Sequence, residues 1–391
     1  MSQPPLPTNA VEPPSAARWI ATCPDETKGV LAAELARLDV LEPEPIYRGV
    51  GFAADLETAY RAHLVLRTAS RIQRIVAEVP ARTARELEAA AASIAWPTWL
   101  LAQYPFTVSP ILTDPQARSL GEESVRAALA QAVAVRFATA GTTAPHFDAS
   151  THDVVTLVAH VRRGVCTLGL DTAGRALHKR GWRLPGHPAV LKETLAASIL
   201  LLAGYDGSEV LLDPMCGSGT LAIEGAYIAL NKAPLIHRGK DDFGFEHQAG
   251  FDRALWRRVS DQVRAAKLPT PRAPIFASDI DRDYVDLARR TALRARVEKH
   301  MTLAVASACD LTPPAASGLL VANLPYGERL GRDNLSELYR NIGRALRDRF
   351  AAWRVALLVP IDAPREALGV RPKREVALTN GALEVRLLLT D

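Results

Sequence analysis

The sequence has few cysteines, no long hydrophobic run and only a small excess of one charge. Its four cysteines, Cys23, Cys166, Cys216 and Cys309, lie far apart among 391 residues and lack the paired spacing of a zinc site. They predict reduced thiols in a cytoplasmic protein with no metal centre. No stretch approaches the roughly 18 consecutive apolar residues of a membrane-spanning helix, so no membrane partner is expected.

The amino-terminal stretch lacks both a basic and an apolar segment, which argues against a secretory signal. Residues 1–16 are rich in proline and alanine, and we expect them to form a disordered leader. With 47 Lys and Arg against 43 Asp and Glu, the net charge of +4 does not by itself indicate a nucleic-acid partner. Hydrophobic residues at 48% and charged residues at 23% are ordinary for a globular protein. At about 150 residues per domain, the length predicts two to three domains.

The first half of the chain mixes short strands and helices, the pattern of an α+β region. Apolar spacing predicts a hairpin whose strands, 153–161 and 165–172, turn at Arg163-Gly164. The stretch 174–188 breaks this periodicity and is interpreted as a linker. The other expected elements are strands at 17–23, 46–55, 71–79 and 106–114 and helices at 28–38, 56–66, 82–94 and 121–137.

The second half alternates apolar strands with helices, which predicts an α/β domain with a mainly parallel sheet and helices on both faces. The region 231–273 interrupts the alternation and is expected to be an irregular insert. The expected strands are 210–213, 273–279, 301–307, 318–323, 354–360 and 385–390, and the expected helices are 191–204, 221–230, 284–295 and 334–350.

A glycine-rich loop joins the first of these strands to the helix that follows it. The loop comprises Asp213, Pro214, Met215, Cys216, Gly217, Ser218, Gly219 and Thr220. Its two glycines allow a sharp turn and a close approach of the backbone to a ligand. The spacing alone also fits a dinucleotide fingerprint or a turn that binds nothing. A dinucleotide site, however, has its next acid about 20 residues downstream, and here the second strand ends only at Asp279.

Acids at the ends of two successive strands suit S-adenosylmethionine. This cofactor carries an ammonium group and a ribose diol but no pyrophosphate, so carboxylates are more useful to it than a long phosphate-binding loop. The positions of Asp213 and Asp279 therefore favour S-adenosylmethionine over a dinucleotide.

A second motif, Asn323-Leu324-Pro325-Tyr326, follows an apolar run at the carboxyl end of an expected strand, where open α/β sheets bind ligands. The exocyclic amine of a base is a poor nucleophile because its lone pair is delocalised into the ring. The Asn323 side-chain oxygen and the Leu324 carbonyl would accept the two N–H groups and orient that lone pair. Tyr326 would stack on the extruded base, and Pro325 would stiffen the loop. Taken alone, the tetrapeptide also fits an Asn-Pro turn with a structural tyrosine.

A basic segment without an acid lies between the two halves. It consists of Arg175, His178, Lys179, Arg180 and Arg183 around Trp182. This combination suits phosphate contacts together with base stacking, so we predict that the segment binds RNA. A solvated linker would have the same composition.

Together these motifs resemble a known group, the class I methyltransferases with an amino-terminal THUMP domain, and within it the RlmL-type 23S rRNA guanine-N2 methyltransferases. The likeness spans most of the chain. The segments that carry it are LRTASR (66–71), LDTAGRALHKRGWR (170–183), PAVLKETLAA (188–197), LLDPMCGSGTLAIEGA (211–226), HRG (237–239), FDRALW (251–256), SDID (278–281) and NLPYGERLG (323–331).

The resemblance implies methyl transfer to the exocyclic N2 of a guanosine, with 23S rRNA as the expected substrate. It also implies that Asp279 holds the ribose hydroxyls of S-adenosylmethionine, that Asp310 faces its adenine amine, and that Lys192 and Glu193 lie beside it. The implied domains are a ferredoxin-like segment at 17–65, an RNA-capturing THUMP domain at 66–173, the basic linker at 174–188 and a Rossmann-like class I methyltransferase domain at 189–391.

The sequence departs from that family in two respects. The rRNA branch usually has Asn-Pro-Pro-Tyr, whereas the second position here is Leu324. The carbonyl that acts is a backbone atom, so the chemistry is expected to survive with a less rigid loop. The chain also ends after one methyltransferase domain, whereas the enterobacterial form fuses a second that makes 7-methylguanosine, so that second activity is expected to be absent.

Three alternatives stay open at this point. A tRNA guanine-N2 methyltransferase belongs to the same superfamily. A non-catalytic RNA-binding assembly factor would need neither the glycine loop nor the Asn323 motif. A DNA adenine-N6 methyltransferase shares the Asn-Pro-Pro-Tyr chemistry but is disfavoured by the long amino-terminal half and the segment 178–183.

Overall fold

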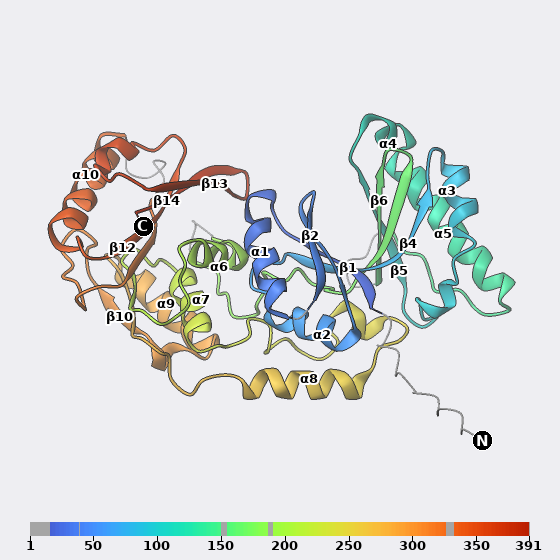
Figure 1. Cartoon of the computed structure of the whole chain (residues 1–391), viewed down its shortest axis with the longest axis horizontal. Coiled ribbons are helices and arrows are strands. Elements are labelled where there is room, and N and C mark those ends of the chain that lie inside the picture. Colours follow the sequence, from blue (N-terminus) through green and yellow to red (C-terminus); the bar gives the residue numbers. More distant parts are fainter. Residues whose placement is uncertain (1–15, 39, 150–154, 187–190, 326–331, 391) are drawn as a thin grey trace, which may run out of the picture.

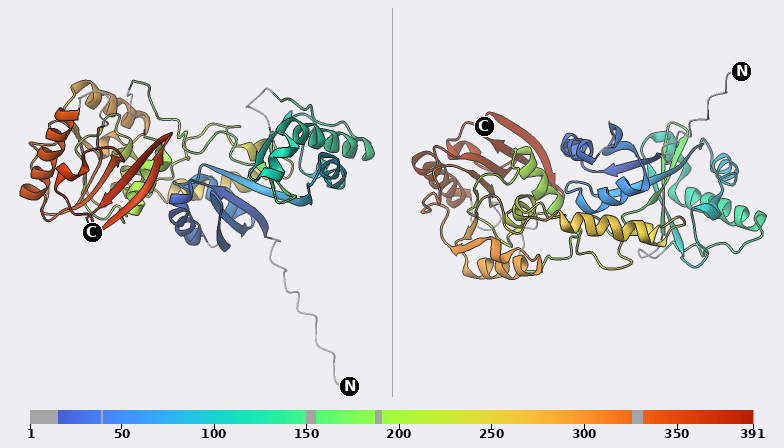
Figure 2. Two further views of the ribbon diagram at one scale, coloured as in Figure 1. Left: turned by 90° about the horizontal axis from the view of Figure 1, so that it is seen from above. Right: turned by 60° about the horizontal axis from the view of Figure 1, so that its bottom comes forward.

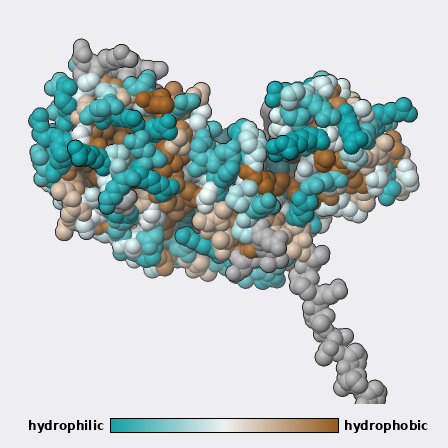
Figure 3. All heavy atoms as spheres, turned by 45° about the horizontal axis from the view of Figure 1, so that its top comes forward, coloured by the Kyte–Doolittle hydropathy of each residue, from teal (hydrophilic) through white to brown (hydrophobic). Residues whose placement is uncertain are grey.

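The structure is a computed structural model that describes residues 16–38, 40–149, 155–186, 191–325 and 332–390. These residues form two seven-stranded sheets, one from each half of the chain. The molecule is elongated, with the second sheet and its helices at one end and the first half reaching to the other (Figures 1 and 2). On the face in Figure 3, hydrophobic residues form small patches within a mainly hydrophilic surface. None of the described helices combines the length and the apolar character needed to cross a membrane.

The first sheet is continuous across the expected boundary between residues 65 and 66. Its strand order is β2-β3-β1-β4-β7-β6-β5, and β1 pairs antiparallel with β4. The two expected domains of this half therefore share one sheet. Its strands are β1 (Ala17–Thr22), β2 (Leu41–Ile46), β3 (Gly49–Ala54), β4 (Arg71–Pro80), β5 (Phe106–Leu112), β6 (Val155–Arg162) and β7 (Val165–Asp171). The helices are α1 (Lys28–Leu35), α2 (Leu56–Val65), α3 (Ala84–Ala91), α4 (Pro115–Leu120) and α5 (Glu122–Thr139).

The two turns of this sheet differ in how well the sequence predicts them. The hairpin of β6 and β7 is confirmed, with Arg163 and Gly164 at φ of 50° and 74°. The strand expected at 46–55 is present as β3 from Gly49, whereas β2, which ends at Ile46, was not predicted. Arg48 makes the turn between them with φ of 55°, a conformation that a non-glycine residue rarely adopts and that its residue type does not signal.

The second sheet confirms the expected parallel α/β domain. Its strand order is β10-β9-β8-β11-β12-β14-β13, in which the first five strands are parallel and β14 runs antiparallel to both neighbours. The expected strand at 385–390 is present, whereas β13 beside it was not predicted. The strands are β8 (Leu211–Asp213), β9 (Ile275–Asp279), β10 (Thr302–Val305), β11 (Leu319–Asn323), β12 (Arg354–Pro360), β13 (Arg374–Asn380) and β14 (Leu383–Leu389).

Helices cover both faces of this sheet, as the unbroken apolar strands predict. Successive side chains on a strand point to opposite faces. Leu211 and Val321 accordingly pack in the core under α6, α7 and α9, and Leu212 and Leu320 pack in the core under α10. The helices of this half are α6 (Glu193–Leu202), α7 (Thr220–Ala229), α8 (Arg253–Ala265), α9 (Arg282–Arg294) and α10 (Arg332–Arg349).

The insert at 231–273 is not irregular throughout, because it contains the helix α8. Asp252 caps this helix by accepting a hydrogen bond from the Leu255 N–H at 2.9 Å. Val259 and Val263 of α8 lie in the same apolar core as strands β1 and β3, and α8 runs along α2 (Figures 1 and 2). The insert of the second half therefore packs against the first half.

Candidate functional site

The predicted cofactor and substrate motifs meet at one edge of the second sheet. The strands that carry them, β8, β9 and β11, are parallel neighbours, so their carboxyl ends lie at the same edge. Asp213 ends β8, Asp279 ends β9 and Asn323 ends β11. The chain proceeds from β8 to β9 on one side and returns with β11 on the other, so β8 and β11 form the topological switch point. Open α/β sheets bind their ligands at this point.

The glycine loop makes the strand-to-helix turn that the sequence predicts. Gly217 and Gly219 have φ of 52° and 83°, a region open to glycine but strained for other residues. The Gly219 N–H donates to the Cys216 carbonyl at 2.7 Å, and α7 begins at the next residue. A Cβ at position 219 would stand 3.2 Å from the Cβ of Ala288 on α9, so the glycine also lets the helices pack.

Asp279 binds the glycine loop to the neighbouring strand. Its Oδ2 accepts the Gly217 N–H at 2.9 Å and its Oδ1 accepts the Asp281 N–H at 3.1 Å. The Ser278 carbonyl accepts the Cys216 N–H at 2.9 Å beside it. The carboxylate is thus fixed in orientation, and each oxygen keeps one acceptor position for a hydroxyl donor.

Asp213 is a buried carboxyl group whose hydrogen-bonding capacity is only partly used. It is 1% exposed. Its Oδ1 receives a long hydrogen bond of 3.4 Å from the Met215 N–H, and its Oδ2 has no partner among the described residues. Burial raises the pKa of Asp213 to about 8, and the negative charge of Asp279 adds to the rise. A ligand that brings a cation or a strong donor would satisfy this oxygen.

The Asn323 motif is anchored by Leu324, the residue at which it departs from Asn-Pro-Pro-Tyr. The Leu324 side chain is 1% exposed in the core under α10, and its N–H donates to the Leu358 carbonyl of β12 at 3.0 Å. The Tyr339 hydroxyl donates to the Pro325 carbonyl at 3.4 Å. Packing of the leucine therefore fixes the backbone that a second proline would otherwise stiffen. Tyr326 lies outside the described residues.

Asp310 lies on a turn that packs against the glycine loop. It is exposed and follows the end of β10 by five residues. Ala308 and Leu311 on either side of it line a small apolar cavity together with Pro214 and Leu324. The structure thus brings the Asp310 segment to both motifs.

Lys192 and Glu193 lie next to parts of the chain other than the glycine loop. Glu193 is buried at the start of α6, and its Oε1 forms a 2.9 Å ion pair with Nε of Arg183. Lys192 lines a polar groove of about 460 Å³ between the two halves, together with Arg48 and Thr379. These contacts do not involve the glycine loop, so a place beside the cofactor stays a prediction for both residues.

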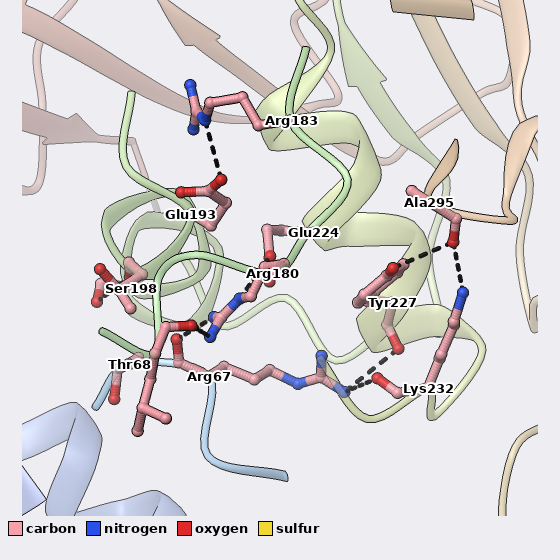
Figure 4. A network of polar contacts seen from close by, with 12 residues as sticks. Arg67, Thr68, Arg180, Arg183, Glu193, Ser198, Glu224, Tyr227, Lys232 and Ala295 are labelled. Atoms are coloured by element: carbon pink, nitrogen blue, oxygen red, sulfur yellow. Dashed lines mark hydrogen bonds and ion pairs between the residues drawn. The ribbon is translucent and has the colours of Figure 1, made fainter. Parts of the chain in front are cut away.

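The prediction that Arg180 and Trp182 bind RNA is wrong, because both side chains are buried. Arg180 forms a 3.2 Å ion pair with Glu224 of α7, and both side chains are fully enclosed (Figure 4). Arg180 also donates to the carbonyls of Arg67 and Leu177. These bonds use three of the five N–H groups of the guanidinium, and its burial keeps the remaining two out of reach of a phosphate.

The rest of the basic segment is divided between ion pairs and solvent. Arg175 pairs with Asp242 at 3.1 Å, and Arg183 pairs with Glu193. His178 is half-buried, and burial lowers its pKa. Lys179 is exposed. The segment is therefore mostly a structural connection, and Arg175 and Lys179 keep enough exposure to reach an anionic partner.

A network around Arg67 and Arg180 joins the two halves of the chain (Figure 4). The Arg67 guanidinium donates to the carbonyls of Lys232 at 3.0 Å and of Tyr227 at 3.3 Å, both in the second half. Glu34 of α1 accepts the N–H groups of Arg67 and Thr68. The sequence gives no signal for these pairings, because the partners are more than 30 residues apart.

Replacing Arg180 with methionine is expected to lower the free energy of unfolding by about 3–5 kcal/mol, because Glu224 would keep a buried carboxylate without its partner. Urea unfolding of Arg180→Met, of Glu224→Gln and of the double variant would measure the loss and its coupling. The double variant is expected to recover part of the loss. A loss below about 1 kcal/mol in Arg180→Met, typical of an exposed pair, would contradict the structural role.

Comparison with known families supports both halves of this description. The sequence pattern of the RMKL-like methyltransferase domain matches residues 180–388, and that of the RlmL ferredoxin-like domain matches residues 18–73. The chain is 35% identical over 371 residues to the ribosomal RNA large subunit methyltransferase K/L of Shewanella sp. (strain ANA-3), and 36% identical over 377 residues to that of Shewanella loihica. Both matches cover 94% of this chain but only 51% and 52% of the relatives. The chain spans about half the length of the curated relatives it matches.

Solved structures share the same architecture. SMU.472, a methyltransferase candidate in complex with SAH, aligns with a TM-score of 0.85 at 26% identity, covering 96% of this chain and 98% of that chain. A possible methylase from Clostridium difficile 630 aligns with a TM-score of 0.86 at 26% identity, covering 96% and 97%. These likenesses and the strand order confirm the Rossmann-like class I fold. Because the methyltransferase pattern covers more than half of its residues, the chain belongs to the RMKL-like methyltransferases and carries an RlmL ferredoxin-like domain at its amino-terminal end.

Proposed function

We propose that the protein transfers a methyl group from S-adenosylmethionine to the exocyclic N2 of a guanosine in 23S rRNA. The observation that carries the proposal is the meeting of Asp213, Asp279 and Asn323 at one sheet edge, across the switch point. The curated relatives are named large-subunit ribosomal RNA methyltransferases, and SMU.472 was solved with SAH, the demethylated form of this cofactor. A ribosomal substrate would place the reaction in the cytoplasm.

The chemistry of the donor set fits S-adenosylmethionine, which when bound supplies a methyl group on a positively charged sulfur. The unsatisfied Oδ2 of Asp213 suits the ammonium group. Asp279 keeps one acceptor position on each oxygen for the ribose hydroxyls. Asp310, on its exposed turn, would accept from the adenine amine. The wall of the site would be formed by Pro214, Cys216, Gly217, Ser218, Gly219 and Thr220.

Asn323 and Leu324 would hold the target base. The amide oxygen of Asn323 and the carbonyl of Leu324 would accept the two N2–H groups, which turns the nitrogen lone pair toward the methyl group. Burial of the Leu324 side chain holds its backbone for this role. The amine becomes acidic as it is alkylated, so its proton can leave to water without a dedicated general base. Alignment of the reacting atoms would supply most of the acceleration.

The amino-terminal half would hold the RNA. Its described residues form the first sheet and its helices, separate from the methyltransferase sheet, and the segment at 66–173 is where the THUMP domain is expected. The expected partner is RNA because a base in a folded RNA must be presented to Asn323 by contacts outside the catalytic edge.

The proposal is tested by incubating the protein and labelled S-adenosylmethionine with total RNA from a strain that lacks the gene. Label is expected in 23S rRNA and, after digestion to nucleosides, in N2-methylguanosine. Label in tRNA would favour the tRNA guanine-N2 alternative instead. Label in another nucleoside, or none in any RNA while SAH still binds, would contradict the proposed reaction.

A further inference from the structure

A groove of about 280 Å³ on the insert concentrates positive charge that the proposed reaction does not use. It lies between α8 and the loop that precedes it. Its charged lining consists of five cationic residues, Arg238, Lys240, Arg253, Arg257 and Arg264, and two acidic ones, Glu246 and Asp261. The net charge of the lining, five cations against two acids, is +3, and the net charge of the whole chain is +4.

Three of the four arginines of α8 form a stripe along one side of the helix. Arg253, Arg257 and Arg264 stand four and seven residues apart, so they lie on one face. The Ser260 side chain lies between them, and its hydroxyl is buried without a partner in the described part of the chain. Val263 is buried in the core shared with the ferredoxin-like strands, so the stripe is the outward face of a firmly packed helix.

Two of these charges are not neutralised by the protein. Arg253 and Arg257 are exposed, and neither forms an ion pair with any described carboxylate. By contrast, Arg264 pairs with Asp261 at 3.0 Å and Lys240 lies 3.8 Å from Asp241. A solvent-exposed helix face usually carries both positive and negative side chains. In α8, by contrast, Asp261 is the only acidic residue.

The groove offers charge but no free aromatic ring. Trp256, on its wall, has its ring 5.5 Å from that of Tyr60 and 5.0 Å from that of Phe245, and so belongs to the core. Arg238 fixes the wall by donating to the carbonyls of Arg175 and Ala176. The site can therefore bind phosphates but has no platform on which a base could stack.

We propose that this groove binds the phosphate backbone of the RNA substrate through Arg253 and Arg257, independently of base sequence. The proposal rests on the proposed function, because it assumes an RNA substrate. A guanidinium suits a phosphate because it donates two parallel hydrogen bonds and stays charged. The helix lies along α2 on the outside of the molecule (Figures 1 and 2), so an RNA held there would touch both halves.

The test compares Arg253→Ala/Arg257→Ala with Arg340→Ala/Arg344→Ala, a matched pair of exposed arginines four residues apart on α10. Each double variant removes two charges, and alanine favours a helix at least as well as arginine. Affinity for protein-free 23S rRNA transcript is measured by filter binding between about 50 and 200 mM salt, the range over which phosphate contacts weaken strongly. Methylation kinetics and SAH affinity are measured on the same proteins.

The α8 variant is expected to bind the transcript about tenfold more weakly at the higher salt, and to lose about 1.4 to 1.8 from the slope of log affinity against log salt, since each contact contributes about 0.7 to 0.9. Its KM for RNA should rise with kcat and SAH affinity unchanged, while the α10 variant should match the wild type. Two results would overturn the RNA-binding role of the groove but not the proposed function. One is an equal loss of RNA affinity in both variants, and the other is no loss of affinity in the α8 variant while the wild type methylates the transcript. A wild type that neither binds nor methylates the transcript would overturn the proposed function as well.

Discussion

Replacing Asn323 with alanine is expected to lower kcat for RNA methylation by about 10²- to 10³-fold, the loss typical of removing one positioned hydrogen-bonding group from an active site. The amide oxygen is proposed to hold one N2–H of the target base, and without it the lone pair stays delocalised into the ring. Asn323 ends β11 beside β8, at the sheet edge that carries the cofactor residues. Single-turnover methylation of 23S rRNA transcript would measure the loss.

The role of Asn323 in chemistry can be separated from a role in folding or cofactor binding. SAH affinity by calorimetry and the thermal midpoint of unfolding are expected to stay close to those of the wild type. Asn334→Ala, at an exposed asparagine near the start of α10, serves as the control and should keep full turnover. Unchanged turnover in Asn323→Ala, or a parallel loss of SAH affinity, would contradict the assignment.

The second half of the chain could be predicted well because its strands are buried on both faces. Such strands appear as unbroken apolar runs, as they do at β11 and β12. The acids and the asparagine that end β8, β9 and β11 follow directly from those runs. Strand β13 was missed because it lies at the edge of the sheet, where four of its seven residues are exposed and no apolar pattern is required.

The basic segment shows what a sequence cannot reveal about charge. Arg180 has no acid near it along the chain, but folding places it against Glu224, which is 44 residues away. Arg183 likewise meets Glu193, which is 10 residues away along the chain. A count of cationic residues in a sequence does not show which group each of them pairs with. An arginine buried in an ion pair and an exposed arginine that binds phosphate cannot be distinguished by residue type. In α8, the signal for the exposed arginines was present but lay in a region expected to lack a helix.

At pH 8, Asp213→Asn is expected to increase the free energy of unfolding of the ligand-free protein by about 2–4 kcal/mol, although it removes a site residue. Burial raises the pKa of Asp213 from 3.8 to about 8. Between these values the folded protein holds a proton that the unfolded chain releases, so stability falls as the pH rises through this window. Asparagine has no such proton and can still accept the Met215 N–H.

The pH dependence of unfolding checks this sign. Urea unfolding at several values from pH 4 to pH 8 should show the variant and the wild type converging at the acidic end, close to the ordinary pKa of 3.8, and diverging toward pH 8. Asp362→Asn, at an exposed aspartate, is the control and should follow the wild type throughout. A constant difference across the range would mean that the gain does not come from the buried carboxyl.

The same substitution is expected to weaken SAH binding by about 10- to 100-fold, the worth of one hydrogen bond to a charged group. An ammonium group bound at Asp213 requires the carboxylate, whereas near pH 7 the ligand-free site holds the carboxyl in its protonated form. Binding by the wild type should therefore release close to one proton, and binding by Asp213→Asn should not. Calorimetry in buffers of different ionisation enthalpy measures this release. Equal release in both proteins would place the ammonium group elsewhere, whereas the expected difference would mean that ligand binding ionises Asp213.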